Sequence, residues 1–387
     1  MRSVDRILTT HVGSLPRPPA LLQKIVDKET GRGTAADFAQ SVRQAVDDIV
    51  AKQASVGLDI VNDGEMGRYG FISYINERLD GFRFGYLEDG STYWGKSREG
   101  LAFPEYYNWS AKQQASAAAV NIAKWVCCGT VSYKGQAALD ADIRNLQDAV
   151  SRHSVKGGFA CAISTTNVET WQRNEFYPSE RDYRYAIADA MRHEYRSIAD
   201  AGLSVQIDDP ALASYYLYNP NATLPEFRKW AEERIEVLNH ALEGIPQERI
   251  RYHTCYGINI GPRTTDLELK HFGDLLLKIR AGVYSFEASN PRHEHEWRVW
   301  KELKIPDDKV LMPGVVTQSS VLVEHPELVA DRIQRFAEIV GRERVIASTD
   351  CGFASFATSN EIHESIVWEK LRALVEGARI ASERLWK

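Results

Sequence analysis

Short runs of β-branched and apolar residues alternate with longer helical stretches along the whole chain, and this alternation constrains the fold more than any other feature. Nine runs read as strands, at 7–12, 58–62, 124–130, 158–163, 204–207, 249–255, 283–287, 309–316 and 345–348. Such alternation is typical of βα units around a parallel sheet. A chain of 387 residues is long for one compact domain unless that domain is a barrel. We therefore predict an α/β fold, a (β/α)8 TIM-type barrel, with residues 1–387 as a single domain.

A closed barrel needs eight strands, so one of the nine candidates lies outside it, and the run at 124–130 is the first suspect. Helical periodicity is clear at 35–56, 181–201, 224–242, 265–279, 326–341 and 362–386. Between about 80 and 116 the composition changes to Gly, Tyr, Phe, Trp and Glu, which predicts a hairpin and loop inserted after an early strand. This insertion would form a wall of the active site or, as an equal alternative, a contact between copies in a homo-oligomer.

Composition narrows the class of partner. The formal net charge is −6, which gives no electrostatic reason to expect nucleic acid or an anionic membrane. No run of about 18 apolar residues and no secretory leader is visible, so we expect a cytoplasmic protein that acts on small molecules. Five cysteines in so long a chain predict reduced thiols and no disulfide framework.

A metal site is predicted where several strands end. His253 and Cys255 lie two residues apart, so both side chains share one face of a strand. Glu287 and Cys351 follow two later strands. Two thiolates, an imidazole and a carboxylate suit tetrahedral zinc better than calcium, magnesium or an iron–sulfur cluster. The alternative for each cysteine is a buried small hydrophobic residue.

The stretches around these residues add a resemblance. Residues 252–256, 285–289 and 349–353 resemble the zinc motifs of cobalamin-independent methionine synthase and occur in the order that this family uses. Residues 9–18, 62–65 and 206–212 look like its substrate-binding segments, so the resemblance spans nearly the whole chain. The resemblance is to the catalytic, C-terminal half of the long members of this family. Short relatives include core methionine synthases and the epoxyalkane:coenzyme M transferases.

The resemblance implies a site for an amino acid. Glu65 and Asp208 match positions that contact homocysteine, and two carboxylates at strand ends can hold an ammonium group. The backbone amides around Gly13 and Ser14 would bind the substrate carboxylate. Without the resemblance, Glu65 would be read as a helix cap and Asp208 as internally paired.

The chain departs from the family at one place. Where the methionine synthases have a histidine proposed to protonate the leaving folate nitrogen, residues 314–320 read Gly-Val-Val-Thr-Gln-Ser-Ser. His293 and His295 could supply that acid, although a solvated loop and a second metal site are alternatives for this pair, and His11 is a further candidate. We expect weak turnover with methylfolates and better turnover with a donor whose leaving group needs no proton.

The sequence therefore predicts zinc-dependent transfer of a methyl group to a small-molecule thiol, homocysteine, giving methionine. The alkyl donor would be a methylfolate, a methylcorrinoid or an epoxide. The first alternative is addition of coenzyme M to an epoxide, which would need Arg17, Arg68 or Arg292 to hold a sulfonate. The second is a non-catalytic barrel stabilised by a structural zinc.

Overall fold

Eight parallel strands form the centre of the molecule in the computed structural model, which describes residues 2–113, 122–257, 261–357 and 362–387. The strand order is β1, β11, β10, β9, β8, β7, β5, β2, and every pair within it is parallel. The two ends of the sheet meet, because the amide of Asp59 donates to the carbonyl of Thr9 (3.1 Å) and the hydroxyl of Thr10 donates to the carbonyl of Ile60 (2.9 Å). The predicted (β/α)8 barrel is confirmed.

Each barrel strand falls on a predicted run. The strands are β1 (Leu8–Thr9), β2 (Ile60–Val61), β5 (Gly157–Ile163), β7 (Ser204–Asp208), β8 (Ile250–Thr254), β9 (Val283–Phe286), β10 (Val310–Val316) and β11 (Ile346–Thr349). The ninth run, at 124–130, lies outside the barrel, as suspected. It is part of β4 (Ile122–Tyr133), which pairs antiparallel with β3 (Leu79–Glu88) and parallel with β6 (Gln172–Asn174).

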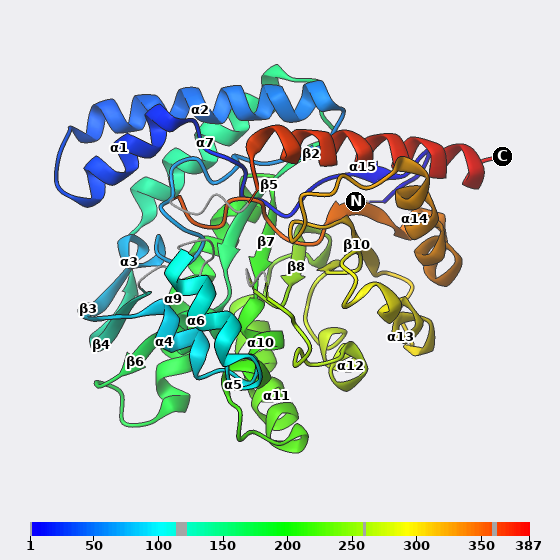
Figure 1. Ribbon diagram of the computed structural model, residues 1–387. Coiled ribbons are helices and arrows are strands. Elements are labelled where there is room, and N and C mark those ends of the chain that lie inside the picture. The colour runs from blue at the N-terminus through cyan, green and yellow to red at the C-terminus, as the bar shows by residue number, and fades with distance from the viewer. Residues whose placement is uncertain (1, 114–121, 258–260, 358–361) are drawn as a thin grey trace.

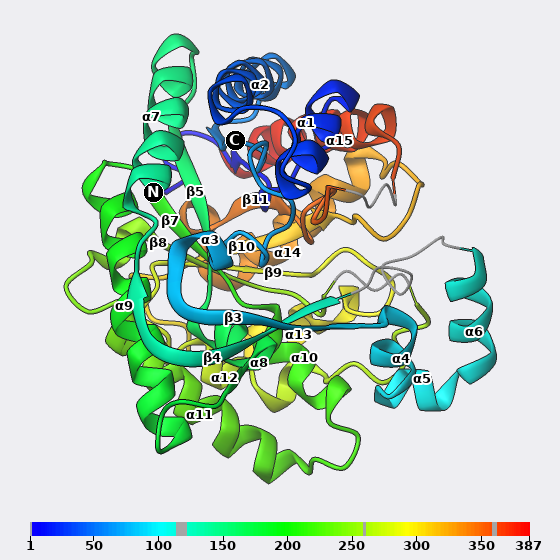
Figure 2. The same cartoon turned by 90° about the vertical axis from the view of Figure 1, so that its left-hand side faces the viewer.

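The insertion is longer than the predicted range of about 80–116, whose last three residues lie outside the described part of the chain. Its two strands are β3 and β4, so the excursion continues to Tyr133. Between them lie α4 (Gly90–Gly95), α5 (Arg98–Ala102) and α6 (Pro104–Gln113). The sequence predicts a hairpin and loop and no helices here, since helices this short have too few turns to give a clear period. Figure 2 shows the two strands crossing one side of the barrel, with these helices at one end.

Helices cover the outside of the barrel (Figure 1). The longer ones are α1 (Pro19–Glu29), α2 (Ala35–Val56), α7 (Gln136–Arg152), α9 (Glu180–Asp200), α11 (Leu224–Ala241), α14 (Pro326–Val340) and α15 (Glu364–Leu385). The shorter ones are α3 (Ile75–Arg78), α8 (Thr165–Trp171), α10 (Pro210–Tyr218), α12 (Gly273–Leu276) and α13 (Trp297–Glu302). Among the described helices, none has the length and apolar character that a membrane span requires.

The prediction of a helix at 265–279 is wrong. Only a 3-10 turn at Leu269–His271 and the single turn α12 form there. The apolar spacing is real, since Leu267, Leu269 and Leu275 are buried. Their burial comes from packing against neighbours in a looped path, which periodicity does not distinguish from a helix.

Local sequence explains where several helices begin. Thr34 caps α2 by accepting from the amide of Asp37, and Thr223 with Glu226 forms a capping box at α11. The barrel interior holds a cluster of apolar residues from β1, β2, β5, β9, β10 and β11, namely Leu8, Ile60, Phe159, Cys161, Val283, Val310, Met312 and Ile346. This plug closes the barrel, so ligands can reach the strands only at their ends.

Candidate active site

A cavity of about 450 Å³ lies at the carboxyl ends of the barrel strands. The strand ends and the loops that follow them contribute Ser14, Glu65, Asp208, His253, Cys255 and Cys351 to its wall. Asp208 and His253 are register partners on β7 and β8, so their side chains emerge beside each other. Catalytic groups of barrel enzymes occupy this end of the fold.

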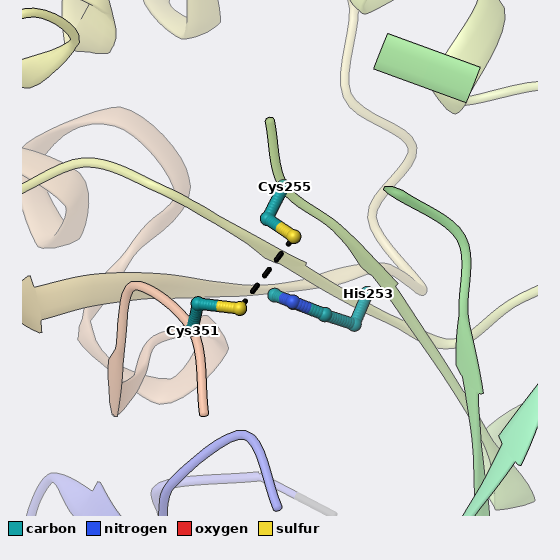
Figure 3. A group of neighbouring side chains, drawn as sticks. All are labelled: His253, Cys255 and Cys351. Atoms are coloured by element: carbon teal, nitrogen blue, oxygen red, sulfur yellow. Dashed lines mark hydrogen bonds between the residues drawn. The ribbon is translucent and has the colours of Figure 1, made fainter. Parts of the chain in front are cut away.

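His253, Cys255 and Cys351 form a compact buried group. One ligand atom of each lies within 4.8 Å of the other two, and the Sγ atoms of the two cysteines are 3.5 Å apart. Figure 3 shows the imidazole pointing toward the two sulfurs. His253 is the second-last residue of β8, Cys255 directly follows that strand, and Cys351 follows β11, so closure of the barrel brings the thiols together.

The chemistry of this group fits a metal ion. The Nδ1 atom of His253 lies 3.0 Å from the hydroxyl of Ser285, whereas its Nε2 atom is buried with no hydrogen-bond partner among the described residues. Two thiolates on a tetrahedral zinc would be about 3.8 Å apart from Zn–S bonds of about 2.3 Å, close to the observed 3.5 Å. The hydrogen bond from Cys351 lowers the pKa of the Cys255 thiol against the opposing effect of burial, which favours the thiolate that a metal requires.

Glu287 is not part of this group. One carboxylate oxygen accepts from the amide of Tyr256 (3.0 Å), and the other accepts from Arg263 (2.9 Å) and Asn290 (2.7 Å). Both partners of the ion pair with Arg263 are buried. The predicted role of Glu287 as a fourth ligand therefore requires that this ion pair be broken or shared.

Glu65 and Asp208 form a second buried group with Cys161, their ligand atoms again within 4.8 Å of one another. Burial raises the pKa of Glu65 to about 7 and that of Asp208 to about 6. The charge of Asp208 raises the pKa of Glu65 further, and Cys255 raises that of Asp208, so a cation placed between the two carboxylates would relieve the repulsion. One oxygen of Glu65 is buried and has no hydrogen-bond partner in the described part of the chain, whereas Asp208 accepts from Gln206 (2.8 Å).

The backbone around these carboxylates is unusual. Glu65 has a φ of 58°, in the left-handed region, and begins no helix, so it is not the helix cap of the alternative interpretation. Gly13 has a φ of 154°, and a Cβ atom there would lie 2.6 Å from the sulfur of Cys161 and 3.5 Å from Glu65. Only glycine therefore lets the chain pass this close to the second group. Ser14 lies beside it in the cavity wall.

The candidate acids lie away from the cavity, whose described lining residues include none of His11, His293 and His295. His293 is buried between Glu296 (2.8 Å) and Asp266 (3.0 Å), so the expected solvated loop is wrong for this residue. Although burial opposes it, hydrogen bonding to these two carboxylates raises the pKa of His293 to about 9. His295 is exposed, and burial lowers the pKa of His11 to about 4.

Sequence reasoning missed most of the aromatic wall of the cavity. Nine described lining residues are Phe, Tyr or Trp, and they include Trp171, Tyr215 and Tyr218. These three follow β5 and β7, in the same kind of strand-to-helix connection as the predicted ligands. The sequence feature that could have predicted this aromatic wall is the presence of aromatic residues just after predicted strands.

Taken together, the fold and the site define a barrel enzyme with metal-ligand groups and a carboxylate pair at the open ends of its strands. A family model described as cobalamin-independent synthase, catalytic domain, matches residues 7–99 and 102–379. The chain belongs to this family, and it is therefore an enzyme of the methyltransferase class, as predicted.

Individual relatives are distant in sequence and match nearly the whole chain. A methionine synthase of Thermococcus kodakarensis is 26% identical over 378 residues, which are 97% of this chain and 94% of the relative. One of Sulfolobus acidocaldarius is 24% identical over 381 residues, 98% and 93% of the two chains. The structure of a B12-independent methionine synthase from Shewanella in complex with selenomethionine superposes with a TM-score of 0.75 at 20% identity, covering 98% of this chain and 99% of that one. The superposition on the Shewanella structure supports the assignment of the fold.

Proposed function

We propose that this enzyme transfers a methyl group to the thiol of homocysteine, giving methionine, with zinc bound by His253, Cys255 and Cys351. The observation that carries the proposal is that a thiol-rich metal group and a buried carboxylate pair line one cavity. Two relatives that match nearly the whole chain are named methionine synthases, which supports the same function. The organisation of residues 1–387 as one domain and the cytoplasmic location remain predictions from the sequence.

Different residues would bind the two ends of the acceptor, the ammonium group and the thiol. Glu65 and Asp208 would bind the ammonium group, because each carboxylate faces the cavity and gains from a cation. Zinc, when bound, would lower the pKa of the acceptor thiol and keep the thiolate nucleophilic. Charged thiolate ligands at Cys255 and Cys351 favour this outcome, since they leave the site rich in electrons.

Addition of coenzyme M to an epoxide is not favoured. Its sulfonate would need a cationic side chain in the cavity, and the described lining residues include no Arg or Lys. Arg17 donates to the carbonyls of Glu65 and Ala354, and Arg68 stacks on Tyr74 at 3.9 Å from the ring centre. Arg292 donates to the carbonyl of Thr264.

A comparison of two acceptors tests the proposal. Homocysteine should bind the zinc-loaded enzyme more tightly than 4-mercaptobutanoate, which lacks only the amine, by about 1.5 to 3 kcal/mol for each charge-assisted hydrogen bond lost. Asp208→Asn should remove most of this preference and leave the affinity for 4-mercaptobutanoate nearly unchanged. Equal affinity of the wild-type enzyme for the two thiols would refute the ammonium clamp.

A further inference from the structure

Aromatic rings form the part of the cavity wall that the strand ends do not supply. One set comes from the insertion and the helices after β5 and β7, namely Tyr93, Trp125, Trp171 and Tyr218. A second set is Phe71 and Phe356, whose rings meet edge to face at 5.7 Å. An antiparallel bridge between Gly70 and Phe356 holds this second pair together. The acceptor site therefore adjoins a part of the cavity that is lined by aromatic side chains.

The described lining of this cavity carries acidic side chains and no Arg or Lys. Its described carboxylates are Glu65 and Asp208. The segments that the structure does not describe contain no Arg or Lys in their sequence either. Burial raises the pKa of Glu65, and Arg68 and Arg17, which do not line the cavity, act in the opposite direction and favour its carboxylate form. An anionic ligand is thus disfavoured and a cationic one favoured.

Two of the rings already carry a cation of the protein. The Nζ atom of Lys124 lies 4.9 Å from the ring centre of Tyr93 and 4.8 Å from that of Trp171, and it is not among the lining residues. Glu88 balances its charge at 3.6 Å. Trp125 also lines the cavity; its ring meets that of Phe84 at a right angle, with 6.2 Å between the ring centres, and no described cation of the protein lies over it.

Resting on the proposed function, we propose that the methyl donor is a small methyl onium compound, a sulfonium or a quaternary ammonium. Ring faces attract methylated cations, which are held elsewhere in cages of Trp, Tyr and Phe. A cavity of about 450 Å³ suits a small molecule and falls near the lower end of the usual range of about 300 to 1,000 Å³.

The chemistry of such a donor matches the residues that are present. The acceptor thiolate gives an electron pair to the methyl carbon, and a new S–C bond forms as the carbon–onium bond breaks. That bonding pair stays on the departing sulfur or nitrogen, which leaves as a neutral thioether or tertiary amine. Nothing is oxidised or reduced, and the leaving group takes no proton, so no general acid is needed. The stretch 314–320 has no histidine, and His293 is held by Asp266 and Glu296.

Binding is measured first, by tryptophan fluorescence or calorimetry, on the whole protein without acceptor. Choline should bind about 5- to 30-fold more tightly than its neutral isostere 3,3-dimethylbutan-1-ol. Trp125→Leu should remove that preference, and Trp125→Phe should keep part of it. Trp109→Leu is the matched control, because Trp109 belongs to the same insertion, is 57% exposed and does not line the cavity. Equal binding of the two probes would overturn the inference, and so would an unchanged preference in Trp125→Leu.

Turnover is measured second, with homocysteine and one donor at a time. Trimethylsulfonium would release dimethyl sulfide and tetramethylammonium would release trimethylamine, so the product identifies which onium class serves. Methionine formed only from methyltetrahydrofolate or methylcobalamin would overturn the inference and leave the proposed function standing. Choline preference without methionine formation from any donor would refute the proposed function while retaining the onium site.

Discussion

The thiol of Cys351 donates a hydrogen bond to the sulfur of Cys255 across 3.5 Å, although 96 positions separate the two residues. Cys255 follows β8 and Cys351 follows β11, and these strands are not neighbours in the barrel. The contact therefore spans the mouth of the barrel. Both cysteines are free, and the buried Nε2 atom of His253 completes the group.

Metal content should depend on this contact. Purified enzyme should carry about one zinc per chain, and Cys255→Ser or Cys351→Ser should lose most of it, because serine is a far poorer ligand at neutral pH. Elemental analysis measures the loss. Cys128→Ser is the matched control, since Cys128 is an exposed free cysteine on β4. Full occupancy in both site variants would disprove the assignment.

Glu287→Ala should destabilise the protein and retain more zinc than the cysteine variants. It leaves the buried guanidinium of Arg263 without its partner, which costs about 3 to 5 kcal/mol of unfolding free energy. Replacing both residues by Met should recover much of the loss. The checks are denaturant unfolding and zinc content. If Glu287→Ala loses zinc as completely as Cys255→Ser, with unchanged stability, Glu287 is a ligand.

Glu65→Gln should raise stability and weaken homocysteine binding. Burial raises the pKa of Glu65 from its ordinary value of 4.5 to about 7, so the folded protein loses stability as pH rises from about 4.5 through 7. At pH 8 the variant avoids the buried charge and should gain about 1 to 3 kcal/mol. The gain should shrink at pH 5. Thermal unfolding at both pH values tests this, and a variant less stable than wild type at pH 8 would contradict it.

His293→Gln should affect stability and leave the pH profile of methyl transfer unchanged. Burial lowers the pKa of His293, but the hydrogen bonds that its ring donates to Asp266 and Glu296 outweigh burial and raise the pKa to about 9, so its contribution is complete below about pH 6.5 and lost as pH rises through 9. We expect a loss of about 2 to 3 kcal/mol at pH 6 and a smaller one at pH 10. The exposed His295→Gln serves as control. A shifted acidic or basic limb in the rate profile of His293→Gln would restore its candidacy as the general acid.

The sequence by itself determined the order of elements. Every barrel strand coincides with a predicted run, because strands buried on both faces are rich in apolar and β-branched residues. The adjacency of His253 and Cys255 was also local, since alternate residues of a strand share a face. Local periodicity failed at 265–279, where buried leucines follow a loop, and at the insertion, where the helices are too short for a period.

Only the tertiary structure decided which side chains meet. The partner of Glu287 is Arg263, in a loop with no periodic pattern, and His293 is drawn between Asp266 and Glu296. Glu65 and Asp208 share one cavity because β2 and β7 both end at its floor. The aromatic wall gathers rings from segments far apart in the chain. Periodicity reports the environment of one element at a time, whereas these pairings depend on closure of the barrel and on how each loop returns across its open end.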